Sequence, residues 1–170
     1  VRADQRPGAE MQDNAIPLTL FPLRVAGRLT PADLIGNGIQ LLLTHDGSRQ
    51  AIAADPGLIN GAVEEILRYE PPISFSARFA KADGVSDGCP YKKGDALVVS
   101  LLAANRDPKR IDTPHSFDIQ RKPNPHLAFG AGAHICIGAP LARIEGQMAI
   151  GQVFARVPGR RHAGSATPAG

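Results

Sequence analysis

The stretch Phe129-Gly-Ala-Gly-Ala-His-Ile-Cys136-Ile-Gly138 sets a single cysteine among three glycines. Directly after it, apolar residues at spacings of three and four predict a helix from about residue 140 to residue 157. Cys136 therefore lies just before a helix N-terminus, where the free backbone N–H groups and the helix dipole favour a thiolate. Glycines allow the backbone to turn sharply and to approach a flat or bulky group. A thiolate in this position serves as a metal ligand or as a nucleophile.

This loop resembles the haem-ligand loop of the cytochrome P450 family, Phe-Gly-x-Gly-x-His/Arg-x-Cys-x-Gly, and every fixed position of that pattern is filled. The resemblance implies heme b (iron-protoporphyrin IX) with Cys136 as its thiolate ligand and with Phe129, Gly130 and Gly138 beside it. From the residues alone, other interpretations stay open. They are a buried free cysteine in a glycine-rich turn, a zinc site, and a cysteine nucleophile, although no convincing His–Asn/Asp arrangement accompanies the cysteine.

Length and composition indicate one globular domain with many loops. The chain has 170 residues, of which 43% are hydrophobic, and it contains 18 glycines and 15 prolines. Its net charge of +3 comes from scattered Lys and Arg residues, which argues against nucleic-acid binding and allows an acidic partner protein. The two cysteines suggest no disulfide framework. No apolar run is long enough for a membrane span and no signal pattern opens the chain, so a cytoplasmic location is the default expectation.

The pattern along the chain predicts a mainly α fold with a small β component, which the resemblance identifies as the C-terminal haem-binding part of a cytochrome P450-like fold. We expect a flexible lead-in at 1–14, a partial P450-like domain at 15–157 and a disordered tail at 158–170. Within the domain, helices are predicted at residues 31–45, 48–54, 55–70 and 140–157. A half-buried strand is predicted at 73–79, and the apolar run at 96–103 is either a strand or a short helix. Residues 109–128 are predicted to be irregular.

Glu65 and Arg68 stand three residues apart on the best-defined helix. At about 100° per residue they project beside the apolar stripe, and composition alone favours an ordinary surface pair. The resemblance implies a different role, because the family has a Glu-x-x-Arg pair in a helix before a strand. That pair would form a structural triad with a later arginine, for which Arg121 is the best match and Arg106 the second choice.

Two further residues owe their roles to the resemblance. Arg78 lies on the polar face of the predicted strand and would pair with a haem propionate. His134, two residues before the cysteine, would serve the other propionate region. Without the resemblance, Arg78 is equally well explained by a solvated strand face and His134 by an ordinary loop position.

Val25-Ala-Gly-Arg-Leu-Thr30 resembles the oxygen-activation stretch of the family's long central helix, Ala-Gly-x-Asp/Glu-Thr. The resemblance implies that Ala26 and Gly27 open a pocket over the iron and that Thr30 is the catalytic hydroxyl. Leu29 stands where the family has an acid. A second interpretation is open, because Thr30 followed by Pro31 is also typical of a helix start and predicts that the long helix is split there.

The resemblance implies a haem-thiolate monooxygenase that activates oxygen, hydroxylates a small organic substrate and takes electrons from a ferredoxin-type or other redox partner, without nucleic acid or membrane. It runs from about residue 25 to residue 157, so we expect a C-terminal fragment that retains haem weakly. The alternative is a non-catalytic or degenerate haem-binding remnant. A third hypothesis, a haem-free interaction module, would be supported by a colourless folded protein.

Overall fold

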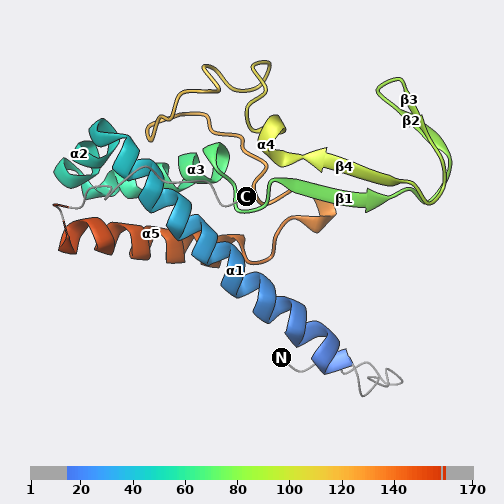
Figure 1. Ribbon diagram of the computed structural model, residues 1–170, viewed down its shortest axis with the longest axis horizontal. Coiled ribbons are helices and arrows are strands. Elements are labelled where there is room, and N and C mark those ends of the chain that lie inside the picture. The colour runs from blue at the N-terminus through green and yellow to red at the C-terminus, as the bar shows by residue number, and fades with distance from the viewer. Residues whose placement is uncertain (1–14, 158, 160–170) are drawn as a thin grey trace.

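The computed structural model describes residues 15–157 and residue 159, so the predicted lead-in and nearly all of the predicted tail lie outside the described residues. The fold is mainly helical with two small sheets, as the sequence predicts (Figure 1). In chain order the elements are α1 Ala15–Thr44, α2 Asp46–Ala54, the 3₁₀ turn η1 Pro56–Leu58, α3 Ile59–Tyr69, β1 Phe75–Phe79, β2 Gly84–Ser86, β3 Cys89–Tyr91, β4 Ala96–Ser100, α4 Leu101–Ala104, the 3₁₀ turn η2 Gly132–His134, and α5 Ala139–Arg156.

The core lies where the second half of α1 packs against α3 and α5 (Figure 1). Apolar side chains from all three helices are fully buried there, among them Leu34, Val63, Ile66 and Ile150. The helices approach so closely that a Cβ at Gly38 of α1 would lie 2.5 Å from the Ile150 side chain of α5. This tight contact fixes α1 and α5 relative to each other.

Helix α1 runs without a break through Pro22 and Pro31, so the prediction of a split at Thr30 is wrong. The Thr30 hydroxyl donates to the Ala26 carbonyl inside the helix, at 2.7 Å, and therefore does not cap a new helix. Pro31 has no N–H to donate to the carbonyl of Gly27, which is the usual reason that proline interrupts a helix. Burial of the following turns, from Leu34 onward, against α3 and α5 outweighs this loss.

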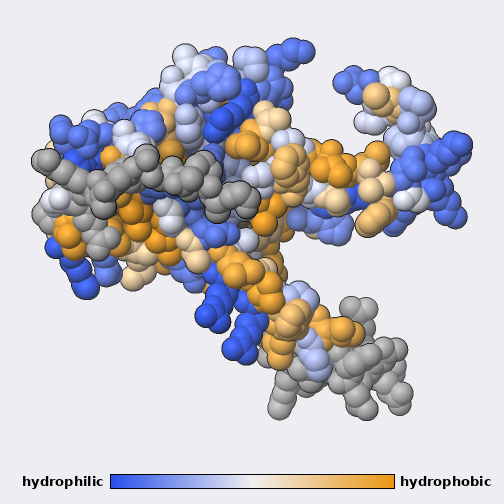
Figure 2. Space-filling view, in the orientation of Figure 1, coloured by the Kyte–Doolittle hydropathy of each residue, from blue (hydrophilic) through white to orange (hydrophobic). Residues whose placement is uncertain are grey.

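Strands β1 and β4 form an antiparallel pair, with Phe75 opposite Ser100 and Phe79 opposite Ala96, and the β2–β3 hairpin extends beyond its far end (Figure 1). The apolar run at 96–103 is predicted to be a strand or a short helix, and it forms one after the other, strand β4 and then helix α4. The strand predicted at 73–79 forms as β1, but the prediction that it is half-buried is wrong, because Phe75 and Phe79 on its apolar side are 60% and 74% exposed. No helix of the described chain covers either face of this two-stranded sheet, and apolar side chains lie on its surface (Figure 2).

Candidate functional site

The Glu65–Arg68 pair lies inside the protein, so its interpretation as a surface pair is wrong. Both side chains are completely buried, and the guanidinium of Arg68 donates to the carboxylate of Glu65 at 2.8 and 2.7 Å. Arg68 also donates to the backbone carbonyls of Asn105, Pro114 and Ser116. The pair is buried because the irregular segment after α4 folds over it, and this contact between distant segments leaves no trace in helical periodicity.

Arg121 is the third member of this buried group. Its Nε lies 3.2 and 3.3 Å from the two carboxylate oxygens of Glu65, and its other nitrogens donate to backbone carbonyls of the same irregular segment. The second choice, Arg106, contacts the Tyr69 carbonyl and Glu70 instead. Glu65, Arg68 and Arg121 together hold residues 105–124 against α3.

The cysteine loop, residues 129–138, follows the irregular segment. The backbone N–H of Cys136 donates to the carbonyl of Phe129 at 2.9 Å, which closes the loop, and the Ala139 N–H donates to the Cys136 carbonyl at 3.3 Å as α5 begins. Gly130 and Gly132 have φ values of +70° and +73°, a conformation in which a side chain would be strained. The Cys136 side chain is free and exposed.

A groove with a volume of about 1080 Å³ lies between the N-terminal half of α1, strand β1 and the cysteine loop. This volume is slightly above the usual range for ligand sites, about 300–1,000 Å³. All nine residues predicted to bind the cofactor or to handle oxygen line this one groove: Ala26, Gly27, Thr30, Arg78, Phe129, Gly130, His134, Cys136 and Gly138. The sequence places them on three separate segments, and the fold brings them together.

One wall of the groove is α1. Ala26 and Thr30 are one helical turn apart, joined by the Thr30 hydroxyl, and a Cβ at Gly27 would meet nothing within 4 Å. This wall therefore leaves open space beside the helix. Leu29, which stands where the resemblance expects an acid, also lines the groove and is 59% exposed.

The other walls carry the basic groups. Arg78 of β1 is exposed and donates to the Ser76 hydroxyl and the Ala77 carbonyl. His134 lies in η2 at the same groove and is also exposed. Within the described part of the chain, no carboxylate forms an ion pair with either residue. Both remain available to a ligand with negative charge.

The residues present fit a haem. An exposed thiol faces a wide, mainly apolar groove that also holds an arginine and a histidine, which is the donor set that a porphyrin with two carboxylates requires. Among the described residues, no cluster of three His, Cys, Asp or Glu side chains could hold a metal ion instead.

A second ion-pair cluster, around Glu64, was missed in the sequence. Arg143 of α5 donates to both carboxylate oxygens of Glu64, at 2.7 and 3.0 Å, and His126 Nε2 lies 3.0 Å from Oε2. Partial burial acts to raise the pKa of Glu64, but hydrogen bonds and charges from His126 and Arg143 outweigh it and lower the pKa from 4.5 to about 2. The partners are 62 and 79 residues away, so no local signal could have revealed them.

This pKa shift predicts a contribution of Glu64 to stability that depends on pH. The contribution is fully present above about pH 4.5 and disappears as the pH falls toward about 2, because the folded-state pKa is the lower one. Urea unfolding of the wild type and of Glu64→Gln should therefore differ most at neutral pH and converge on acidification. A difference that stays constant from pH 7 to pH 3 would contradict the assignment.

Comparison with known proteins agrees with this geometry. The family description "Cytochrome P450" matches residues 54–156, which include α3, the irregular segment, the cysteine loop and α5. The chain belongs to the cytochrome P450 family. Relatives include Cytochrome P450 CYP107DY1 of Priestia megaterium, 40% identical over 89% of this chain and 37% of its own, and Cytochrome P450 monooxygenase PikC of Streptomyces venezuelae, 42% identical over 93% and 38%.

Solved cytochrome P450 structures share the fold. P450BioI, in complex with an acyl carrier protein carrying hexadec-9Z-enoic acid, superposes with a TM-score of 0.88 at 40% identity and covers 93% of this chain and 41% of its own. The Bacillus subtilis 168 bacillaene synthase P450 PksS gives a TM-score of 0.90 at 36% identity, over 96% and 42%. The chain thus spans about two fifths of the length of the cytochromes P450 that it matches. No helix among the described residues is long and apolar enough to cross a membrane.

Proposed function

We propose that this chain is the haem-binding part of a cytochrome P450 monooxygenase, with Cys136 as the thiolate ligand of heme b. The observation that supports the proposal most is the groove onto which the exposed Cys136, Arg78 and His134 all open. Bound thiolate-ligated haem supplies the oxygen and one-electron chemistry by which this family oxidises organic molecules. Titration of the purified full chain with haem tests the first requirement of the proposal, which is haem binding.

The residues of the groove have separate roles in this proposal. Arg78 and His134 bind and orient the carboxylates of the porphyrin, while the open space beside Ala26 and Gly27 admits the small reactants. The Thr30 hydroxyl donates a hydrogen bond to the Ala26 carbonyl, so its lone pairs can accept a hydrogen bond from a donor group in the groove. Its hydroxyl is thus suited to hold a donor in place beside the helix.

The substrate is a small organic molecule, and the electrons come from a ferredoxin-type or other redox partner. Support comes from relatives named as a monooxygenase, PikC, and as a vitamin D(3) 25-hydroxylase, of Pseudonocardia autotrophica, which is 44% identical over 86% of this chain and 36% of its own length. The mainly apolar lining of the groove suits such substrates.

A second candidate function is haem binding without catalysis. Two observations favour it. Leu29 cannot carry a proton at the position where the resemblance expects an acid. Phe21 of α1 and Ile137 of the cysteine loop line the groove and are 71% and 88% exposed, so these walls are open to water. A chain that gives a thiolate-type spectrum but transfers no oxygen to any substrate when electrons are supplied would support this alternative.

Arg78 offers a quantitative test of the cofactor site. Replacing Arg78 by alanine should weaken haem retention by about tenfold, the lower end of the effect of losing a supporting contact. The matched control is Arg49→Ala, which removes an arginine from α2, outside the groove. Haem transfer to apomyoglobin measures the dissociation rates, and equal rates for the two variants would exclude Arg78 from the site.

A further inference from the structure

Glu64 ties together three segments that meet at the cysteine loop. It lies in α3, its partner Arg143 lies in the second turn of α5, and its partner His126 lies in the irregular segment three residues before Phe129. Arg143 donates Nε to Oε1 and Nη2 to Oε2, a two-point contact that fixes the plane of the guanidinium. The Glu64 hydrogen bond raises the pKa of Arg143, so the charge is permanent.

His126 is fixed at both ring nitrogens. The backbone N–H of Ala128 donates to Nδ1 at 3.3 Å, so in the neutral ring the proton lies on Nε2 and points to Glu64. The side chain is only 4% exposed. The contact with Glu64 therefore requires no positive charge on the histidine, and the ring cannot turn without loss of a hydrogen bond.

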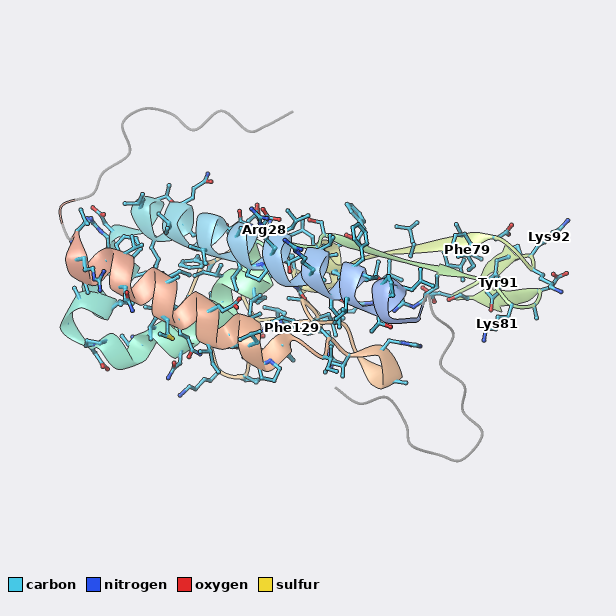
Figure 3. All side chains as sticks on the ribbon, turned by 90° about the horizontal axis from the view of Figure 1, so that it is seen from below. Arg28, Phe79, Lys81, Tyr91, Lys92 and Phe129 are labelled. Carbon is cyan, nitrogen blue, oxygen red and sulfur yellow. The ribbon has the colours of Figure 1, made fainter. Side chains whose placement is uncertain are left out.

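Arg143 and His126 both contact the ring of Phe129. The guanidinium carbon of Arg143 lies 4.7 Å from the ring centroid, within the range of a cation–π contact, and the His126 ring centroid lies 6.1 Å away. Figure 3 shows Phe129 beside the first turns of α5. The same residue accepts the backbone N–H of Cys136 through its carbonyl. A continuous set of contacts thus leads from Glu64 to the main chain of the cysteine.

We propose that Glu64, Arg143 and His126 form a positioning cluster that holds Phe129, and through its carbonyl the main chain of Cys136, so that the cysteine sulfur is presented to the groove in one orientation. The consequence for haem rests on the proposed function, whereas the consequence for the loop does not. The two can therefore be separated by experiment.

The test uses the full chain without haem and measures hydrogen exchange of the Cys136 amide. Arg143→Lys keeps the positive charge but loses the two-point contact and the planar group over Phe129, and Glu64→Gln keeps the shape but loses the charge. Both variants should exchange the Cys136 amide about tenfold faster, which corresponds to a local opening that costs ~1.4 kcal/mol less. The control Asp46→Asn changes a carboxylate of α2 that is 68% exposed and lies outside the cluster, so it should leave the rate unchanged.

The amide of Ile66, in the core of α3, reports global opening in the same samples. Unchanged exchange at Cys136 in folded Arg143→Lys overturns the proposal, and so does an equal acceleration at Ile66, since the cluster would then stabilise the fold as a whole. If Glu64→Gln does not fold, Arg143→Lys alone decides.

A second measurement separates this proposal from the proposed function. In haem-loaded protein, both cluster variants should release haem about tenfold faster and show a smaller share of the thiolate-type carbonyl band. If the wild-type chain binds no haem while Cys136 exchange still responds to Arg143→Lys, the proposed function fails and the positioning cluster stands. If haem binds but neither variant changes its release or its spectrum, the cluster does not position the ligand.

Discussion

Replacing Cys136 by alanine is expected to remove the thiolate-type band from the ferrous carbonyl spectrum completely. Alanine supplies no ligand, and within the described residues the only other cysteine, Cys89, lies in strand β3 and does not line the groove. Because the Cys136 side chain is exposed, its loss should change the free energy of unfolding of the haem-free chain by no more than about 0.5 kcal/mol. The variant should thus be folded and unable to form the iron–sulfur bond.

Cys89→Ala is the matched control, since it removes the same exposed thiol from the hairpin. It should keep both the fold and the thiolate-type band. Carbonyl difference spectra and thermal unfolding curves of the two variants distinguish loss of the ligand from loss of the fold. A Cys136→Ala protein that kept the band would show that another residue binds the iron.

Replacing Arg68 by alanine should have the largest effect on stability. The substitution leaves the fully buried Glu65 without its two closest donors. It also removes a donor from the carbonyls of Asn105, Pro114 and Ser116, of which Ser116 keeps a bond from Arg121. Breaking a buried ion pair from one side costs about 3–5 kcal/mol. This loss is comparable with the whole stability of many domains, about 5–15 kcal/mol, so we expect little folded protein and no haem binding.

Arg106→Ala is the control for this prediction, because Arg106 lies near the same segment but contacts the carbonyl and the ring of Tyr69 and the half-exposed Glu70 rather than a buried carboxylate. Its loss should cost about 1 kcal/mol. Urea unfolding at neutral pH compares the two variants. Equal losses of stability would mean that burial of the Glu65–Arg68 pair does not determine how much the pair contributes to the free energy of unfolding.

The parts of the fold that sequence predicts well depend on local patterns. A helical segment begins at Pro56, close to the predicted start at residue 55, with the Asp55 carboxylate accepting the Gly57 N–H at 2.9 Å. Its first turn is the 3₁₀ turn η1, and α3 follows from Ile59. Helix α5 begins at Ala139, one residue from its predicted start. The glycines near the cysteine are expected to let the backbone turn sharply, and Gly130 and Gly132 have positive φ values.

The parts that sequence predicts poorly depend on contacts between distant segments. Proline propensity argued for a break at Thr30, but α1 continues because its second half is buried by α3 and α5. Helical spacing put Glu65 and Arg68 at the surface, whereas a segment some 40 residues further on covers them. The Glu64 cluster likewise joins residues that nothing in their local sequence connects.

The ferrous carbonyl difference spectrum of the purified wild-type chain, after addition of haem and reduction, tests the central claim most directly. It reports haem binding and thiolate ligation in a single measurement. We predict a red-shifted, thiolate-type band that depends on Cys136. A folded chain that stays colourless, or binds haem only with the unshifted band of a nitrogen-ligated or thiol-ligated iron, would contradict the account.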